Sequence, residues 1–279
     1  YSDGMSERAI GIFTRTYGKK IYVATKCGRR WDEKGKVFGS LTRDSVRAEC
    51  EASLRRLGVD VIDLYQIHWP DPEEYIEEAW DAIAGLVKEG KVRYGGVSNF
   101  SVEQMERVRG IFPISSLQPP YSMIRRKAEK ELFEYCRTND IGVIVYSPMQ
   151  KGLLTGKYTR ELIAAFPEDD HRRNDSQFKE PTLSANLELV EGLRRIADRH
   201  GRTCAQLALA WVLRRKEVTA AITGMRRASQ AEDTTAAGEW ELDEGVIREI
   251  EELLRRREES CLLYTSDAAD ELDGVDLGG

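Results

Sequence analysis

The sequence predicts a parallel α/β fold with one sheet and helices outside it. Short apolar runs alternate with amphipathic helical patterns six times along the 279 residues, and each such connection favours a parallel right-handed crossover. No Gly-x-Gly-x-x-Gly turn follows a strand, which argues against the alternative of an open doubly wound sheet. We therefore expect a (β/α)8 barrel (TIM barrel) that lacks roughly its first two strand–helix units.

The strands are expected where β-branched, aromatic and aliphatic residues are dense. The clearest run, 61–69, lies between Gly58 and Pro70 and is too short for a helix. Apolar residues on both of its faces indicate a strand buried on both sides. The expected strands are residues 21–25, 61–69, 92–97, 114–117, 141–146 and 218–222.

The helices are expected where apolar residues recur at three- and four-residue spacing. Thr42 is a suitable N-cap and Gly58 a suitable end for a helix with Val46, Cys50 and Leu54 on one face. In the first expected helix, Ile10, Ile12 and Phe13 lie on one side. The expected helices are residues 7–17, 42–57, 72–89, 101–109, 127–137, 184–200 and 204–214, and a last one begins near 229.

Three segments fall outside the alternation. Residues 27–40 are polar and glycine-rich and are expected to form a loop, and the polar stretch 157–181 is expected to be a large mobile loop. The chain after Cys261 has neither a helical nor a strand period. We expect one domain over residues 1–258 and a tail over 259–279 that is either translated sequencing-adapter read-through or disordered.

Composition and charge exclude several classes of protein. The 42 basic residues are interspersed with 48 acidic ones for a net charge of −6, which argues against nucleic acid and membrane-surface partners. The apolar runs are too short to cross a bilayer. Five cysteines without metal-ligand spacing predict reduced thiols, a cytoplasmic protein and no metal site. They are Cys27, Cys50, Cys136, Cys204 and Cys261.

A polar side chain stands at the carboxyl end of each expected strand. Taken alone, Lys26 could be a solvated strand end and Asn99 a helix cap. In a parallel barrel, however, all these ends meet at one face, where the chemistry of such folds takes place. The residues are Lys26, His68, Asn99, Gln118, the Tyr146-Ser147 pair and the Arg226-Arg227 pair.

Most of these residues stand within longer motifs. The motifs are Tyr1-Ser2-Asp3-Gly4-Met5-Ser6-Glu7, Ala24-Thr25-Lys26, Asp63-Leu64-Tyr65-Gln66-Ile67-His68, Gly96-Val97-Ser98-Asn99-Phe100, Leu117-Gln118-Pro119-Pro120-Tyr121 and Tyr146-Ser147-Pro148 with 152–158. Through these motifs, the chain resembles the aldo-keto reductase family over residues 1–257. The resemblance implies that Tyr1, Lys26 and His68 are catalytic. The family's catalytic Asp has no counterpart here, and because Tyr1 is not Met, we expect the natural N-terminus to be missing.

The resemblance also implies NADP(H) as cofactor. Ser98, Asn99 and Gln118 correspond to the contacts of the nicotinamide carboxamide, and Tyr146 to the ring that stacks on the nicotinamide. The pyrophosphate loop corresponds to Ser147, Pro148, Met149, Gly152 and Leu153. The segment for the 2′-phosphate and the adenine corresponds to Gly224, Met225, Arg226, Gln230 and Asp233, followed by Thr234 where the family commonly has Asn.

These residue types suit the reduction of a carbonyl. Hydride addition builds negative charge on oxygen, and a Tyr beside a Lys ammonium can donate the proton that neutralises it. His68 can hydrogen-bond the same oxygen. We expect a reductase acting on a small carbonyl compound. The alternatives are a non-catalytic NADPH-binding subunit, as in the potassium-channel β subunits, and an inactive fragment. Because two strand–helix units and the catalytic Asp are expected to be missing, we expect residues 1–279 alone to be poorly folded and to have negligible reductase activity. Neither the substrate nor the oligomeric state follows from the sequence.

Overall fold

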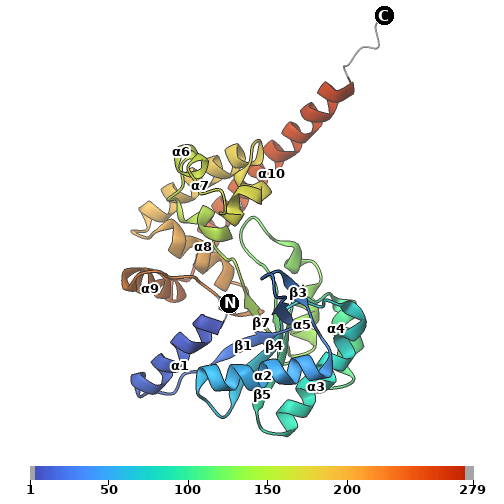
Figure 1. The fold of residues 1–279 in the computed structure, drawn as a ribbon. Helices are drawn as coiled ribbons and strands as arrows, with labels where there is room; N and C mark the ends of the chain where they lie inside the picture. The colour runs from blue at the N-terminus through green and yellow to red at the C-terminus, as the bar shows by residue number, and fades with distance from the viewer. Residues whose placement is uncertain (1–3, 274–279) are drawn as a thin grey trace, which may run out of the picture. The chain divides into compact units, whose positions relative to one another are not determined.

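The computed structural model describes residues 4–273, with side chains as far as residue 261. The chain forms two compact units, each described here by itself. The N-terminal unit comprises Tyr1–Pro119 and Lys127–Ile144, and the C-terminal unit comprises Pro120–Arg126 and Val145–Gly279. Figure 1 shows the elements of both units.

Strands form near all six predicted positions, and those of the N-terminal unit pair in the order β1-β4-β5-β6-β7. The strands are β1 (Ala24–Cys27), β4 (Ile62–Ile67), β5 (Val92–Ser98), β6 (Ser116–Gln118), β7 (Gly142–Val145) and β8 (Val218–Ala221). The pairs from β1 to β7 are parallel, and their register places Lys26, Gln66, Gly96 and Ser116 in one row across four strands.

The first strand begins later than predicted. The expected range was 21–25, whereas β1 is Ala24–Cys27, so Lys26 lies inside the strand. The Val23 N–H is taken by the Asp63 carboxylate at 2.9 Å instead of joining a ladder, and Tyr22 is 77% exposed. A side-chain contact of this kind is invisible to a pattern of apolar residues.

The expected loop 27–40 is in fact a β-hairpin made of β2 (Arg29–Trp31) and β3 (Val37–Gly39). The Asp32 carboxylate closes its turn by accepting the backbone N–H groups of Lys34 and Lys36 at 2.9 and 2.8 Å. Asx turns of this type let a polar sequence reverse direction without an apolar signal.

Among the described residues of the N-terminal unit, five α-helices accompany the strands. They are α1 (Met5–Tyr17), α2 (Arg43–Leu57), α3 (Ile76–Lys88), α4 (Val102–Arg109) and α5 (Leu132–Thr138). Thr42 caps α2 as predicted, accepting from Ser45 N–H at 3.3 Å, and Gly58 ends it in the left-handed conformation. The helices α2 and α3 pack side by side (Figure 1), and their apolar faces are buried.

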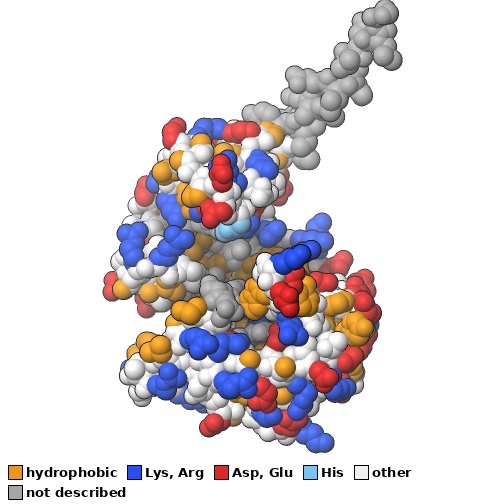
Figure 2. All heavy atoms as spheres, in the orientation of Figure 1, with side chains coloured by type: hydrophobic (Ala, Val, Ile, Leu, Met, Phe, Trp, Pro, Cys, Tyr) orange, Lys and Arg blue, Asp and Glu red, His pale blue; other side chains and the backbone are white. Residues whose placement is uncertain are grey.

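Helix α1 differs from the prediction in what it buries. Ile12 and Phe13, expected on an apolar packing side, are 58% and 49% exposed, and of the helix only Gly11 is fully buried. A Cβ at Gly11 would lie 2.4 Å from the Leu57 carbonyl oxygen, so α1 packs against the end of α2 through this glycine. Figure 2 shows hydrophobic side chains at the surface around α1.

The C-terminal unit is mostly helical. Its longer helices are α7 (Thr182–Arg199), α8 (Cys204–Leu213), α9 (Ala228–Thr235) and α10 (Glu244–Asp273). The segment 157–181, expected to be a large loop, instead contains the short helices α6 (Arg160–Ala164), η5 (His171–Asn174) and η6 (Ser176–Phe178). Ile163, Phe166 and Phe178 from this segment form an apolar cluster with Leu153 and Leu183.

Helix α10 continues to Asp273, through residues after Cys261 in which the sequence showed no helical period. The division between a domain ending at 258 and a tail over 259–279 remains a prediction. All five cysteines are free, as expected. Across residues 4–273, no helix combines the length and apolar character that crossing a membrane requires.

Candidate active site

The structure places Lys26 and His68 at the carboxyl ends of neighbouring parallel strands, as predicted. Cys27 in β1 lies opposite Ile67 in β4, and His68 follows directly, its N–H donating to the Cys27 carbonyl at 3.0 Å. His68 leaves the ladder there because Trp69-Pro70 follows, and proline cannot continue it. Both side chains are partly buried.

The pKa values of both side chains are shifted by their surroundings. Burial lowers the pKa of His68 to about 4, and the positive charges of Lys26 and Arg29 add to the effect. Burial also lowers the pKa of Lys26. The imidazole is therefore neutral near pH 7 and carries one N–H donor that can approach a developing oxyanion.

The next strand ends hold the predicted residues Ser98, Asn99 and Gln118. Ser98 Oγ donates to the Gln118 carbonyl oxygen at 2.8 Å, and Asn99 Nδ2 donates to the His68 carbonyl at 3.0 Å and to Ser98 Oγ at 3.1 Å. Asn99 has φ +62°, a left-handed conformation that Asn tolerates better than most residues. The structure thus brings five predicted residues together in the N-terminal unit: Lys26, His68, Ser98, Asn99 and Gln118.

Sequence reasoning missed two features of this unit. The first is the fully buried side-chain amide of Gln66, which is hydrogen-bonded to Gln118. The sequence signal that could have indicated it is a polar residue inside an apolar strand. The second is the pair of apolar side chains Val37 and Phe38 of the β2–β3 hairpin, each at least 42% exposed. Figure 2 shows hydrophobic side chains around this hairpin.

The predicted pyrophosphate loop lies in the C-terminal unit and has an unusual backbone. Ser147, Gln150, Lys151 and Gly152 have φ of 55°, 45°, 54° and 92°, where only the glycine is free of strain. The Lys151 ammonium is held by the Asp175 carboxylate at 2.6 Å. Left-handed residues close together turn backbone N–H groups toward one side, which suits an anion.

The other predicted residues of this loop differ in exposure. Pro148 and Leu153 are buried, Leu153 within the apolar cluster, while Met149 is partly buried. Tyr146 is half-buried, and burial raises the pKa of its hydroxyl. Its carbonyl accepts the Tyr121 N–H at 3.2 Å.

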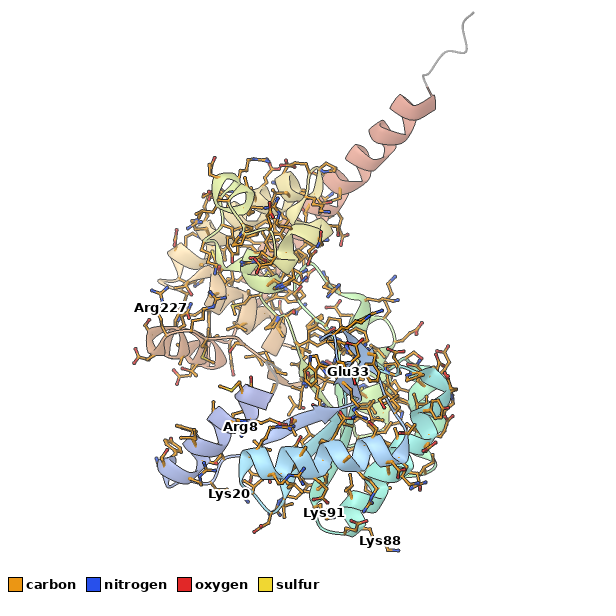
Figure 3. The ribbon with its side chains drawn as sticks, viewed as in Figure 1. Arg8, Lys20, Glu33, Lys88, Lys91 and Arg227 are labelled. Carbon is orange, nitrogen blue, oxygen red and sulfur yellow. The ribbon has the colours of Figure 1, made fainter. Side chains whose placement is uncertain are left out.

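The predicted 2′-phosphate segment precedes and enters α9. Gly224, Met225 and Arg226 are exposed, and Gln230 Oε1 accepts the Arg226 backbone N–H at 2.8 Å, fixing the turn. Asp233 contacts Thr203, the N-cap of α8, whose hydroxyl donates to the carboxylate at 3.1 Å. Figure 3 labels Arg227 at the start of α9. Gln230 and Asp233 therefore have structural contacts, and their role toward a cofactor remains a prediction.

Tyr1 lies outside the described residues. Within the part of the chain whose side chains are described, no group of His, Cys, Asp and Glu is arranged to hold a metal ion.

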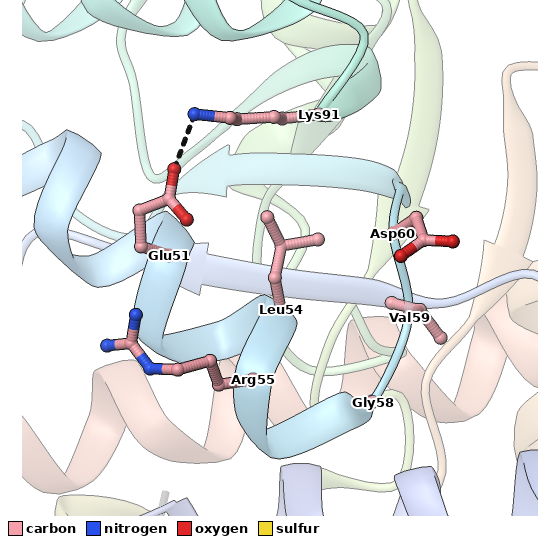
Figure 4. A pocket seen from close by; sticks show the side chains of 7 residues that line it. All are labelled: Glu51, Leu54, Arg55, Gly58, Val59, Asp60 and Lys91. Atoms are coloured by element: carbon pink, nitrogen blue, oxygen red, sulfur yellow. Dashed lines mark hydrogen bonds and ion pairs between the residues drawn. The ribbon is translucent and has the colours of Figure 1, made fainter.

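Two hollows of the N-terminal unit contain none of the predicted catalytic or cofactor-binding residues. One of about 430 Å³ is lined by residues from the end of α2 and the starts of β4 and β5, among them Glu51 and Lys91, which form an ion pair at 2.5 Å (Figure 4). The other, about 510 Å³, lies between α1 and the residues leading into β1.

The parallel sheet carries Lys26, His68, Asn99 and Gln118 at its strand ends, and comparison with known proteins identifies the family. The Aldo/keto reductase family matches residues 1–255, so this chain belongs to that family.

Aldo-keto reductase YhdN of Bacillus subtilis (strain 168) is 36% identical over 91% of this chain and 77% of its own length. The NADH-specific methylglyoxal reductase of Escherichia coli (strain K12) is 31% identical over 92% of this chain and 82% of its own. The NADP(+) aldo-keto reductase yakc of Schizosaccharomyces pombe (strain 972 / ATCC 24843) is 33% identical over 90% of this chain and 75% of its own length.

The structure of a glycerol dehydrogenase from Gluconobacter oxydans matches with a TM-score of 0.86 and 36% identity, covering 91% of this chain and 78% of that one. The match confirms the predicted fold class. Family membership supports an oxidoreductase that uses a nicotinamide cofactor and a small carbonyl substrate. The enzyme names of these relatives do not favour the alternative of a non-catalytic regulatory subunit.

Proposed function

We propose that this protein reduces aldehydes or ketones to alcohols with NADPH, using Tyr1 as the proton donor. The observation that supports this most is the placement of Lys26 and His68 on neighbouring strand ends, with the imidazole kept neutral beside the ammonium. When bound, the reduced nicotinamide supplies a hydride to the carbonyl carbon.

In this proposal each residue acts on one atom of the reaction. The His68 N–H orients the carbonyl oxygen, and the Tyr1 hydroxyl transfers its proton to that oxygen as negative charge develops. The Lys26 ammonium stabilises the phenolate that remains, which then takes a proton from water. Alcohol and reprotonated enzyme are the products.

The cofactor contacts that we propose match the chemistry of the residues present. Ser98, Asn99 and Gln118 offer hydroxyl and amide groups to the carboxamide, Tyr146 offers a ring face, and the loop from Ser147 to Leu153 offers backbone N–H groups to the pyrophosphate. Arg226 would bind the 2′-phosphate and so select NADP(H), although one relative is named NADH-specific. The cytoplasmic location remains a prediction from the sequence.

The test compares Lys26→Met with Lys20→Met, an exposed lysine six residues earlier (Figure 3). Oxidation of NADPH by a panel of small aldehydes and ketones would be followed by absorbance, and cofactor binding by fluorescence. Lys26→Met should lower turnover by roughly two to four orders of magnitude while NADPH still binds. Both variants are made in the full-length protein. Turnover that falls no further in Lys26→Met than in Lys20→Met would contradict the proposed role, and absence of NADPH turnover in the full-length wild type would contradict the function.

A further inference from the structure

Three buried polar side chains form a directed chain of hydrogen bonds beneath the strand ends of the N-terminal unit. Gln118 Nε2 donates to Gln66 Oε1 at 2.9 Å, and Gln66 Nε2 donates to Ser116 Oγ at 3.2 Å. Gln118 is 4% exposed, Gln66 0% and Ser116 5%. Water therefore does not compete for the amide of Gln66.

The space for this chain is created by Gly96. Register places Gln66, Gly96 and Ser116 side by side on β4, β5 and β6. A Cβ at Gly96 would lie 2.3 Å from Ser116 Oγ and 3.0 Å from Gln66 Cγ. The glycine thus lets the side chains of β4 and β6 meet across the intervening strand.

In the structure the hydrogen bonds run from Gln118 through Gln66 to Ser116, so the orientations of the two amides are coupled. Gln66 Nε2 donates a hydrogen bond to Ser116 Oγ, and Gln66 Oε1 therefore faces Gln118 as an acceptor. Gln118 must then turn its nitrogen toward Gln66. A primary amide carries oxygen and nitrogen on opposite branches, so the Gln118 oxygen is left to accept from another donor. Reversing Gln118 alone would set two oxygens against each other in a dry site, which is costly, so Gln118 can turn only if Gln66 turns with it.

We propose that Gln66 is a positioning residue that fixes the amide orientation of Gln118, and thereby favours a nicotinamide carboxamide over an analogue without its NH₂ group. The inference rests on the proposed function, in which Gln118 contacts that carboxamide. Gln118 Oε1 accepts from the carboxamide NH₂, and an acetyl group in the same position has no hydrogen to give.

The test measures the dissociation constants of NADP⁺ and of 3-acetylpyridine adenine dinucleotide phosphate for three variants. Gln66→Met keeps the length of the side chain but leaves Gln118 free to turn. Gln66→Glu keeps an oxygen that accepts from Gln118 Nε2, while the Ser116 hydroxyl can donate to its other oxygen. Ile67→Val, one residue along the same buried strand, reports on packing alone.

In the wild type, NADP⁺ should bind more tightly than the acetyl analogue. In Gln66→Met the preference should fall by about 5–10-fold, the effect of one oriented hydrogen bond, while Gln66→Glu and Ile67→Val retain it. Equal weakening for both ligands in Gln66→Met, or a preference that does not change, would overturn the role of Gln66 and leave the proposed function standing. A wild type that binds neither ligand would overturn the proposed function, and this inference with it.

Discussion

The side-chain nitrogen of Asn99 donates to the backbone carbonyl of His68 over 3.0 Å, joining the ends of two neighbouring strands. The bond holds the turn after β4 in place and requires Asn99 to adopt φ +62°. One residue therefore links the predicted catalytic group to the predicted cofactor contacts.

Replacing Asn99 by Ala should be more harmful than replacing it by Gly. Both variants lose the amide bonds to His68 and Ser98, but only Ala must also bear the left-handed conformation, at a cost of about 1–2 kcal/mol. Urea unfolding should give the Gly variant the larger free energy of unfolding. If the Ala variant is the more stable of the two, the strained backbone has relaxed and this account of Asn99 is wrong.

His68 should make stability depend on pH in a defined window. Its pKa is lowered from 6.5 to about 4 on folding, so the unfolded chain binds the proton more readily. Stability from this group is complete above pH 6.5 and decreases as pH falls toward 4. The difference in unfolding free energy between wild type and His68→Gln should therefore shrink across that window, by about 1–2 kcal/mol for a partly exposed group. A difference that is constant from pH 7 to 4 would contradict the prediction.

A methyl group at Gly96 should destabilise the N-terminal unit. It would lie against Ser116 Oγ and Gln66 Cγ in a filled interior, and overpacking of this kind costs about 1–3 kcal/mol. Gly110→Ala, at the end of α4, is the matched control because nothing lies within 4 Å of the added atom. Thermal unfolding should show a lower Tm for Gly96→Ala and little change for Gly110→Ala. Equal Tm values for the two variants would show that the space between Gln66 and Ser116 accommodates a methyl group at Gly96.

Arg226 should decide between the two nicotinamide cofactors. Its backbone N–H is fixed by Gln230, which places an exposed guanidinium at the start of α9. Arg226→Ala should weaken NADPH by roughly 10-fold or more, as expected for a charge-assisted hydrogen bond, and leave NADH affinity almost unchanged. The control is Arg8→Ala, an exposed arginine on α1 (Figure 3). If the ratio of NADPH to NADH affinity changes equally in Arg226→Ala and Arg8→Ala, Arg226 does not determine the cofactor preference.

The local elements were largely predictable because their signals are local. Thr42 caps the start of α2 with its side chain, and Gly58 ends the helix with a positive φ. Both effects depend on residues within one helical turn. The strand before His68 was predicted from its apolar residues, and His68, Asn99 and Gln118 then followed as neighbours because parallel strands end at one edge. The family, fold class and general reaction were likewise evident in the motifs.

The errors arose where side-chain hydrogen bonds or contacts between distant residues decide the backbone. Asp63 takes the Val23 N–H and delays β1, and Asp32 closes a hairpin that has no apolar pattern. Phe166 and Phe178 lie twelve residues apart in a polar stretch, so nothing in a local window showed that they would share a cluster.

The sequence by itself determined which residue types stand at the strand ends, since alternation and capping are properties of neighbours along the chain. Only the tertiary structure decided how those residues act on one another. The neutral state of His68 depends on burial and on Lys26 from another strand, and the orientation of Gln118 depends on Gln66, which lies 52 positions away in the sequence. Desolvation and hydrogen-bond direction arise from packing in three dimensions, and a linear pattern carries no record of either.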